Sequence, residues 1–191
     1  MKLSIIDYFL VGLLVLAVYN DITRKKIPNK ITMPAILIGI IWSTLNSGLN
    51  GFLFSIFGFL FGLTVFLIPY IAGGIGAGDV KLLATIGAIK GWRFTLFSSL
   101  STAAVGGVLV IVYMIYTGRL KTMLINTLGL LMKPLFKLIL KISNNHIIFI
   151  GYQYFENYKG NKEDTYIPYA LAIAIGTIAV LLGAFDGIIK I

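Results

Sequence analysis

Two aspartates stand where apolar and polar segments of the chain meet. Asp21 follows a first apolar segment, residues 4–20, and Asp79 precedes a short one, residues 80–89. Two carboxylates that share one proton can hold a water molecule, because one accepts its proton while the other donates to a carbonyl oxygen. This chemistry needs no metal, Cys, Ser or His, which suits a chain with no Cys and a single His.

Each aspartate also has an ordinary structural interpretation. Asp21 stands in a polar stretch with several basic residues, where a solvated side chain is common. Asp79 could serve as the N-cap of the helix that follows, since Asp is favoured at that position. Gly76 and Gly78 would let the backbone bend closely around Asp79. Only as a pair do the two carboxylates offer hydrolytic chemistry.

The composition indicates an integral membrane protein. Of the 191 residues, 58% are hydrophobic and 12% are charged, whereas a soluble domain carries about 25% charged residues. Residues 31–78, 94–118 and 165–185 contain no Asp, Glu, Lys or Arg. Each stretch can cross a hydrocarbon core of about 30 Å at least once. These features exclude a water-soluble domain, and the lack of Cys excludes a disulfide framework and a thiolate zinc site.

The apolar pattern predicts an all-α membrane protein with about six transmembrane helices. The whole chain, residues 1–191, is expected to form a single integral-membrane domain. The fourth span is short, and is either thin, tilted or partly re-entrant. The expected spans cover residues 4–20, 31–46, 52–71, 80–92, 95–117 and 167–188.

Residues 118–166 form an insertion between the fifth and sixth spans. Within it, residues 121–142 are apolar except for polar and basic side chains that fall on one helical stripe. We expect an amphipathic helix in the plane of the membrane interface, with a seventh span lining a pore as the alternative. Residues 143–165 are expected to form an exposed loop, with partial membrane association around residues 147–154 as a further alternative. The stripe consists of Thr122, Asn126, Lys133, Lys137 and Lys141.

The basic residues predict the orientation in the membrane. With six spans, the loops at 21–30, 72–81 and 118–166 share one side and carry 12 of the 16 Lys and Arg residues. Because Lys and Arg collect on the cytoplasmic side, these loops are expected there, in a multi-pass protein of the cytoplasmic membrane. The net charge of +9 is then explained by topology, and no nucleic-acid partner is expected. Asp21 and Asp79 both fall at the cytoplasmic boundary.

Three sequence motifs resemble those of one known family. Residues 76–81, Gly-Ala-Gly-Asp-Val-Lys, resemble the GxGDxK signature of the type IV prepilin peptidases, which belong to the GxGD class of intramembrane aspartyl proteases. Asp21 ahead of Ile-Pro-Asn at residues 27–29 resembles the first motif of that family. Residues 167–176 are similar to the proline-containing start of its last helix.

The resemblance implies an aspartic endopeptidase that removes the short basic leader from prepilin-like or preflagellin-like precursors at the cytoplasmic membrane face. It implies Asp21 and Asp79 as the catalytic pair, with no metal and no cofactor. Many members carry an N-terminal region with paired CxxC motifs and methylate the new N-terminus. This chain starts at the first peptidase span and has no Cys, so neither zinc nor S-adenosylmethionine is expected, and it resembles peptidase-only members such as the Tad-type and archaeal preflagellin enzymes.

Five further motif positions carry supporting expectations. The two glycines are expected to let the second aspartate approach the substrate backbone. The lysine is expected either to tune the charge of the pair or to extend toward lipid headgroups, and the Pro-Asn pair to shape the loop after the first span. These positions are Gly76, Gly78, Lys81, Pro28 and Asn29.

Two other classes of function are compatible with the residues alone. Two boundary aspartates, a glycine-broken helix and a lysine stripe also occur in small proton-coupled membrane carriers. An inactive scaffold within a pilus or secretion assembly would need no aspartate pair at all.

Overall fold

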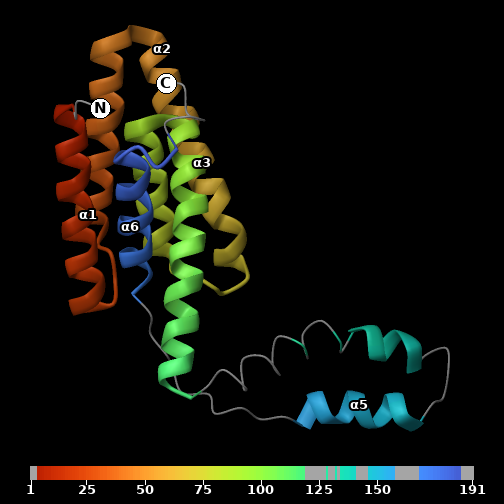
Figure 1. Ribbon diagram of the computed structural model, residues 1–191. Helices are drawn as coiled ribbons and strands as arrows, with labels where there is room; N and C mark the ends of the chain where they lie inside the picture. The colour runs from red at the N-terminus through yellow and green to blue at the C-terminus, as the bar shows by residue number, and fades with distance from the viewer. Residues whose placement is uncertain are drawn as a thin grey trace. The chain divides into compact units, whose positions relative to one another are not determined.

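In a computed structural model, the described residues form helices and turns, with no strand among them. The all-α prediction is therefore confirmed for the described part of the chain. That part comprises residues 4–118, 128, 132, 134–140, 146–157 and 168–185. The helices are α1 (Ile5–Arg24), α2 (Asn29–Ile71), α3 (Ala77–Tyr116), α5 (His146–Asn157) and α6 (Tyr169–Leu181) (Figure 1).

The chain divides into two compact units. The first comprises Met1–Val108 and Tyr166–Ile191, and the second comprises Leu109–Thr165. The second unit contains α5, in a stretch that was expected to be a loop; its 12 residues are helical. Most of the expected interfacial helix lies outside the described residues, although Lys137 falls within a described helical stretch, residues 134–140.

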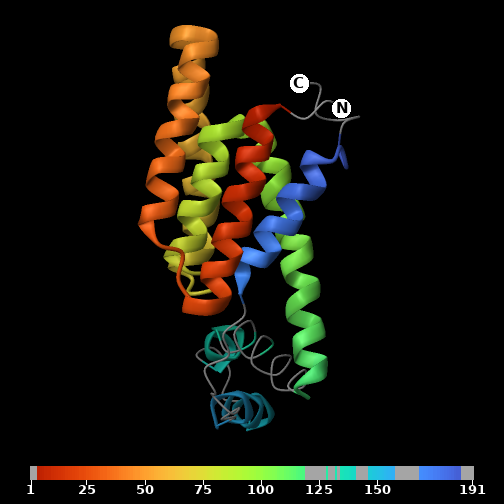
Figure 2. The ribbon, with the colours of Figure 1, turned by 90° about the vertical axis from the view of Figure 1, so that its left-hand side faces the viewer.

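Both long helices reverse direction at a glycine. Gly48 in α2 has φ 56 and ψ −135, and Gly91 in α3 has φ 78 and ψ 174. Figures 1 and 2 show the chain turning back at both places. Such positive φ values favour glycine, which lacks a Cβ atom. The expected breaks after the spans 31–46 and 80–92 are thus found, close to Gly48 and Gly91. Each helix consists of two antiparallel halves.

Among the described helices, α1, α2 and α3 are long and apolar enough to cross a membrane. The last helix is shorter than expected, because α6 covers 13 residues rather than 167–188. The N–H of Ala184 donates to the carbonyl of Ala179, and the N–H of Gly183 donates to that of Val180. Together with the φ of 94 at Gly183, these bonds form a Schellman motif, which ends a helix. A glycine inside an apolar run hides this end from a hydropathy pattern.

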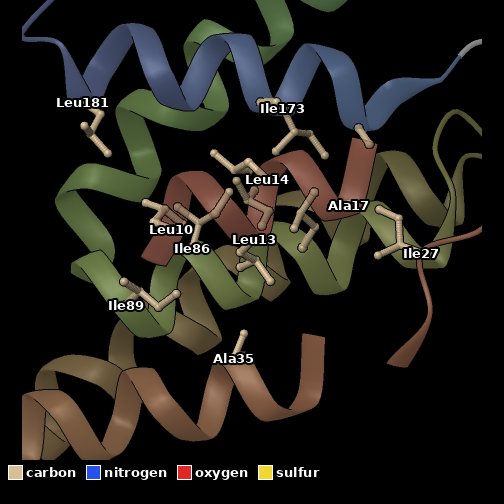
Figure 3. Packing of buried hydrophobic residues seen from close by; sticks show 14 of the residues in the cluster. Leu10, Leu13, Leu14, Ala17, Ile27, Ala35, Ile86, Ile89, Ile173 and Leu181 are labelled. Carbon is tan, nitrogen blue, oxygen red and sulfur yellow. The ribbon is translucent and has the colours of Figure 1, made fainter. Parts of the chain in front are cut away.

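The apolar core of the first unit lies where α1 packs against α3 and α6. Leu10 and Leu14 of α1 are fully or almost fully buried, as are Ile86 of α3 and Ile173 of α6. Figure 3 shows these side chains pointing toward one another between the three helices. Because Leu10 and Leu14 lie on the face of α1 that also carries Asp21, this packing directs Asp21 toward α3 and α6.

Glycines bring the backbones of α2 and α3 into direct contact. A Cβ atom added at Gly87 would lie 2.0 Å from the carbonyl oxygen of Gly58, and the reverse construction gives the same 2.0 Å. The hydroxyl of Ser55 donates to the carbonyl of Ala88 at the same crossing. Small residues permit such close helix packing in membranes. The contact fixes the first half of α3, residues 77–90, which carries Asp79.

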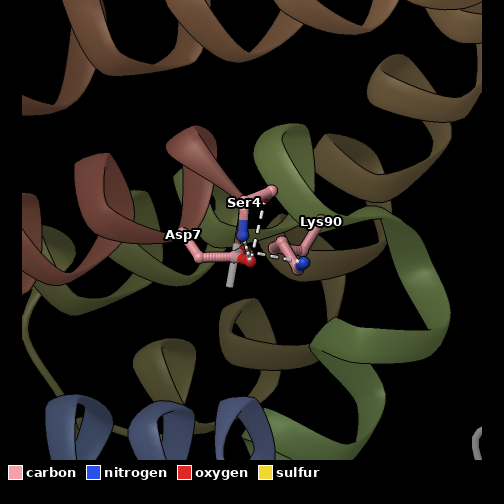
Figure 4. Close-up of polar contacts among 3 residues, drawn as sticks. All are labelled: Ser4, Asp7 and Lys90. Atoms are coloured by element: carbon pink, nitrogen blue, oxygen red, sulfur yellow. Dashed lines mark hydrogen bonds and ion pairs between the residues drawn. The ribbon is translucent and has the colours of Figure 1, made fainter. Parts of the chain in front are cut away.

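A partly buried ion pair joins α1 and α3 at the end opposite Asp21 and Asp79. Lys90 Nζ lies 2.9 Å from Asp7 Oδ1, and the backbone N–H and hydroxyl of Ser4 donate to Asp7 Oδ2 at 2.8 and 2.9 Å (Figure 4). No sequence pattern predicted this pair. A Ser followed three residues later by an acid is a capping-box pattern, but it gives no indication of Lys90.

We expect Gly87→Ala to destabilise the protein by about 1–3 kcal/mol, because backbone atoms of Gly58 must move to admit the methyl group. Gly107→Ala is the matched control, since no atom lies within 4 Å of its Cβ position and alanine favours a helix. Thermal unfolding in detergent micelles measures both. Equal unfolding temperatures for Gly87→Ala and wild type would contradict the close crossing.

We expect Lys90→Met to destabilise the protein by about 3 kcal/mol, because it leaves Asp7 buried without its cation. The double variant Asp7→Asn/Lys90→Met removes both charges and is expected to be more stable than Lys90→Met alone. Chemical unfolding of the wild type, both single variants and the double variant completes the cycle. Strictly additive losses would show that the two side chains do not interact.

Candidate active site

Asp21 lies in the last turn of α1 and is bound to the beginning of α6. Its side chain is buried, with 5% of the residue exposed, and its Oδ2 accepts a hydrogen bond of 3.1 Å from the N–H of Ala170. The first N–H groups of a helix have no acceptor within the helix and carry positive partial charge. Asp21 satisfies one of them. It is therefore not the solvated loop residue of the ordinary interpretation.

Pro168 explains why this N–H group is available. It occupies the N-cap position of α6 with φ −69 and ψ 93, and it makes no side-chain capping bond. Since proline has no hydroxyl, amide or carboxylate to act as a cap, the first turn of α6 takes its acceptor from α1. The third sequence motif thus has a structural role, which is to present the start of α6 to Asp21.

Asp79 is the third residue of α3 and uses its two carboxylate oxygens differently. Oδ2 accepts a 3.1 Å hydrogen bond from the N–H of Gly76, the residue before the helix. Asp79 is thus not the N-cap itself but reaches back to it, as the acid of a capping box does. Oδ1 is buried and has no hydrogen-bond partner among the described residues. The structural and chemical interpretations are compatible, because each needs only one oxygen.

The structure brings the two aspartates together from helices that are far apart in sequence. The charge of Asp21 acts on Asp79, and both residues are at least nine-tenths buried. They lie at the end of the first unit where the loops 25–28 and 72–76 meet the start of α6 (Figure 2). In the described ranges, no group of three or more His, Cys, Asp or Glu residues is arranged to hold a metal ion.

The motif glycines serve close packing rather than chain reversal. The left-handed residue of this loop is Gly73, with φ 77, and neither Gly76 nor Gly78 has a positive φ. A Cβ at Gly76 would lie 3.2 Å from Asp79 Oδ2, and a Cβ at Gly78 would lie 3.1 Å from the Cβ of Ile27. The small size of the two glycines lets the Asp79 carboxylate and Ile27 approach the backbone closely. That they also let Asp79 approach a substrate backbone stays a prediction.

Lys81 links the two motif segments. Its Nζ donates a 2.9 Å hydrogen bond to Oδ1 of Asn29, the first residue of α2. The sequence did not indicate this contact, and the two expected roles of Lys81, tuning of the aspartates and extension to headgroups, stay predictions. Pro28 takes the N-cap position of α2 with φ −71 and ψ 142, so it does shape the loop. Together with Ile27 against Gly78, the bond holds the loop after α1 on the first turn of α3.

Tyr169 is a further residue beside the aspartates, and the sequence patterns assigned it no role. It is the first residue of α6, and the charge of Asp79 acts on it. Its ring packs edge-on against Phe66 with 6.2 Å between centroids. In the sequence, Tyr169 could have been found by its place next to Pro168 in the third motif. No local pattern, however, shows which side chains of α6 face α1 and α3.

Comparison with known proteins identifies the family. The sequence model of the type IV leader peptidase family matches residues 8–111. The chain belongs to this family. The matched range of this leader peptidase homologue contains Asp21, Asp79 and the two motif segments around them, whereas α6 lies beyond it.

Curated relatives are similar over part of their length. The chain is 34% identical over 117 residues to the prepilin leader peptidase/N-methyltransferase of Bacillus subtilis, covering 58% of this chain and 44% of the relative. It is 32% identical over 110 residues to the protein of that name from Pseudomonas aeruginosa, covering 53% and 37%. The chain thus spans less than half the length of these relatives. No solved structure gives a significant match.

We expect a coupling energy of about 1 kcal/mol between Lys81 and Asn29, typical of a hydrogen bond to a charged group that water partly screens. Lys81→Met, Asn29→Ala and the double variant give this energy by chemical unfolding. Lys26→Met, at an exposed lysine of the neighbouring loop, is expected to leave stability unchanged. A coupling energy of zero would show that the bond does not hold the loop on α3.

Proposed function

We propose that this chain is a membrane-embedded aspartic endopeptidase that removes the short basic leader from prepilin-like or preflagellin-like precursors. Membership of the type IV leader peptidase family supports the substrate class. The observation that carries the mechanism is the placement of two buried aspartates from separate helices, near enough for the charge of Asp21 to act on Asp79. Asp79 also keeps one oxygen without a partner among the described residues.

The proposed topology has six spans, formed by α1, the two halves of α2, the two halves of α3, and α6. Loops 25–28 and 72–76 and the start of α6 lie at one end of the first unit. With six spans, the inter-span segments 21–30, 72–81 and 118–166 fall on one side of the membrane, and they carry 12 of the 16 Lys and Arg residues. This charge bias supports a cytoplasmic location for that end, and hence for the aspartates.

The proposed reaction uses one oxygen of each aspartate to position it and leaves the rest for chemistry. Asp21, held by the positive end of α6, acts as the base that takes a proton from a water molecule. The water oxygen then forms a bond to the scissile carbonyl carbon. Asp79 donates the shared proton from Oδ1 to the carbonyl oxygen. On collapse the C–N bond breaks, the proton on Asp21 passes to the leaving amine, and the shared proton returns to Asp79.

The boundary position of the pair solves a physical problem of cleavage in membranes. A peptide bond inside a lipid-buried helix lacks water, and its carbonyl is already hydrogen-bonded within the helix. At the cytoplasmic end, a leader can enter as extended chain while the apolar segment behind it remains in the bilayer. The site therefore suits a substrate that is polar on one side of the cut and apolar on the other.

The proposal predicts that Asp21→Asn and Asp79→Asn each lower the rate of leader cleavage at least about 10³-fold, because neither amide can exchange the required proton. Cleavage of a membrane-embedded prepilin-like precursor in proteoliposomes measures this. Both changes preserve side-chain shape, and Glu156→Gln, at an exposed acid of α5, is the control expected to retain activity.

Insertion and thermal unfolding are checked for every variant. Cleavage that persists after either aspartate substitution in a properly inserted protein would contradict the aspartyl mechanism. It would then favour the carrier or the scaffold function.

A further inference from the structure

The backbone at the start of α6 places one more side chain beside the aspartate pair. Ala170, whose N–H binds Asp21, directly follows Tyr169, and consecutive Cα atoms are about 3.8 Å apart. The side chain of Tyr169 therefore starts from the same helical turn that holds Asp21. Asp79, on the other side of the pair, is near enough for its charge to act on Tyr169.

The ring of Tyr169 is held between the second halves of α2 and α3. It packs edge-on against Phe66 of α2, with an interplanar angle of 61°. On the α3 side, a Cβ atom added at Gly106 would lie 3.0 Å from the Tyr169 hydroxyl oxygen. Only a glycine at position 106 leaves enough room for the tyrosine ring in this position. Because both walls are formed by helices, the position of the hydroxyl is set by the fold rather than by a mobile side chain.

The Tyr169 hydroxyl has no hydrogen-bond partner in the described part of the chain. A buried or half-buried tyrosine hydroxyl usually finds a hydrogen-bond partner. Tyr169 is half-buried, yet across residues 4–118 and 168–185 its hydroxyl makes no hydrogen bond. Among the described residues, the held O–H group is thus available as a donor, within range of the charge of Asp79. Asp79 Oδ1 likewise has no partner there.

We infer that Tyr169 is a catalytic residue that donates a hydrogen bond to the carbonyl oxygen of the scissile peptide. The inference rests on the proposed function. When water attacks, negative charge develops on that oxygen, and a donor already in place stabilises the transition state more than the substrate. Asp79 supplies the proton and Tyr169 supplies the second donor. Tyr169 keeps its own proton throughout, so no additional reactant is needed.

The test is Tyr169→Phe, which removes the hydroxyl and keeps the ring between Phe66 and Gly106. We expect kcat to fall about 10²-fold, as for loss of one oxyanion donor, with KM and the unfolding temperature unchanged. The matched control is Tyr19→Phe, on α1 two residues before Asp21, where 64% of the residue is exposed. It is expected to keep the wild-type kcat.

A second variant tests the position of the hydroxyl without removing it. Gly106→Ala forces the tyrosine ring to shift by a few tenths of an ångström, since its Cβ would come within 3.0 Å of the ring and hydroxyl. We expect a smaller loss of kcat, and no further loss when Gly106→Ala is combined with Tyr169→Phe. Equal losses in the presence and absence of the hydroxyl would show that Gly106 acts through packing alone.

The outcomes separate this inference from the proposed function. If Asp79→Asn loses cleavage while Tyr169→Phe retains the wild-type kcat, the aspartyl peptidase stands and the role of Tyr169 is wrong. A Tyr169→Phe variant that loses kcat only in proportion to its folded fraction likewise overturns the role. If Asp79→Asn still cleaves, the proposed function itself fails.

Discussion

The hydrogen bond from the N–H of Ala170 to Asp21 joins the end of α1 to the beginning of α6. Each group would be costly to bury alone, because a carboxylate needs donors and the first N–H groups of a helix need acceptors. The two needs are met by one contact across 149 residues of sequence. The places of Asp21, of Tyr169 and of the first turn of α6 all depend on it.

The second aspartate is fixed by different means. Asp79 is bound to the backbone N–H of Gly76, and the helix that carries it is pressed against α2 through Gly58 and Gly87. Neither of these contacts involves Oδ1 of Asp79. A residue can therefore cap a helix and remain available for chemistry, provided that the cap occupies only one carboxylate oxygen. Since Asp79 Oδ1 has no partner among the described residues, a proton, water or substrate is expected to satisfy it.

The two helices that carry the aspartates are also joined at their other ends. Asp7 and Asp21 are 14 residues apart on α1, and Asp79 and Lys90 are 11 residues apart on α3, about four and three helical turns. Both pairs thus fall on nearly one face of their helix. The partly buried ion pair at one end and the aspartate pair at the other enclose the apolar contact of Leu10 and Leu14 with Ile86, so sliding of one helix along the other would disturb both.

The sequence by itself determined the features that depend on local composition. The uncharged stretches indicated apolar helices, the turn residues near Gly48 and Gly91 indicated the reversals, and the motifs singled out Asp21 and Asp79. Local composition did not show that α6 ends at Leu181 or that residues 146–157 are helical. The tertiary structure alone decided the partners of Asp21, Lys81 and Lys90, which lie 149, 52 and 83 residues away. A hydrogen bond between distant segments leaves no periodic trace in either of them, because its geometry exists only once the helices have packed.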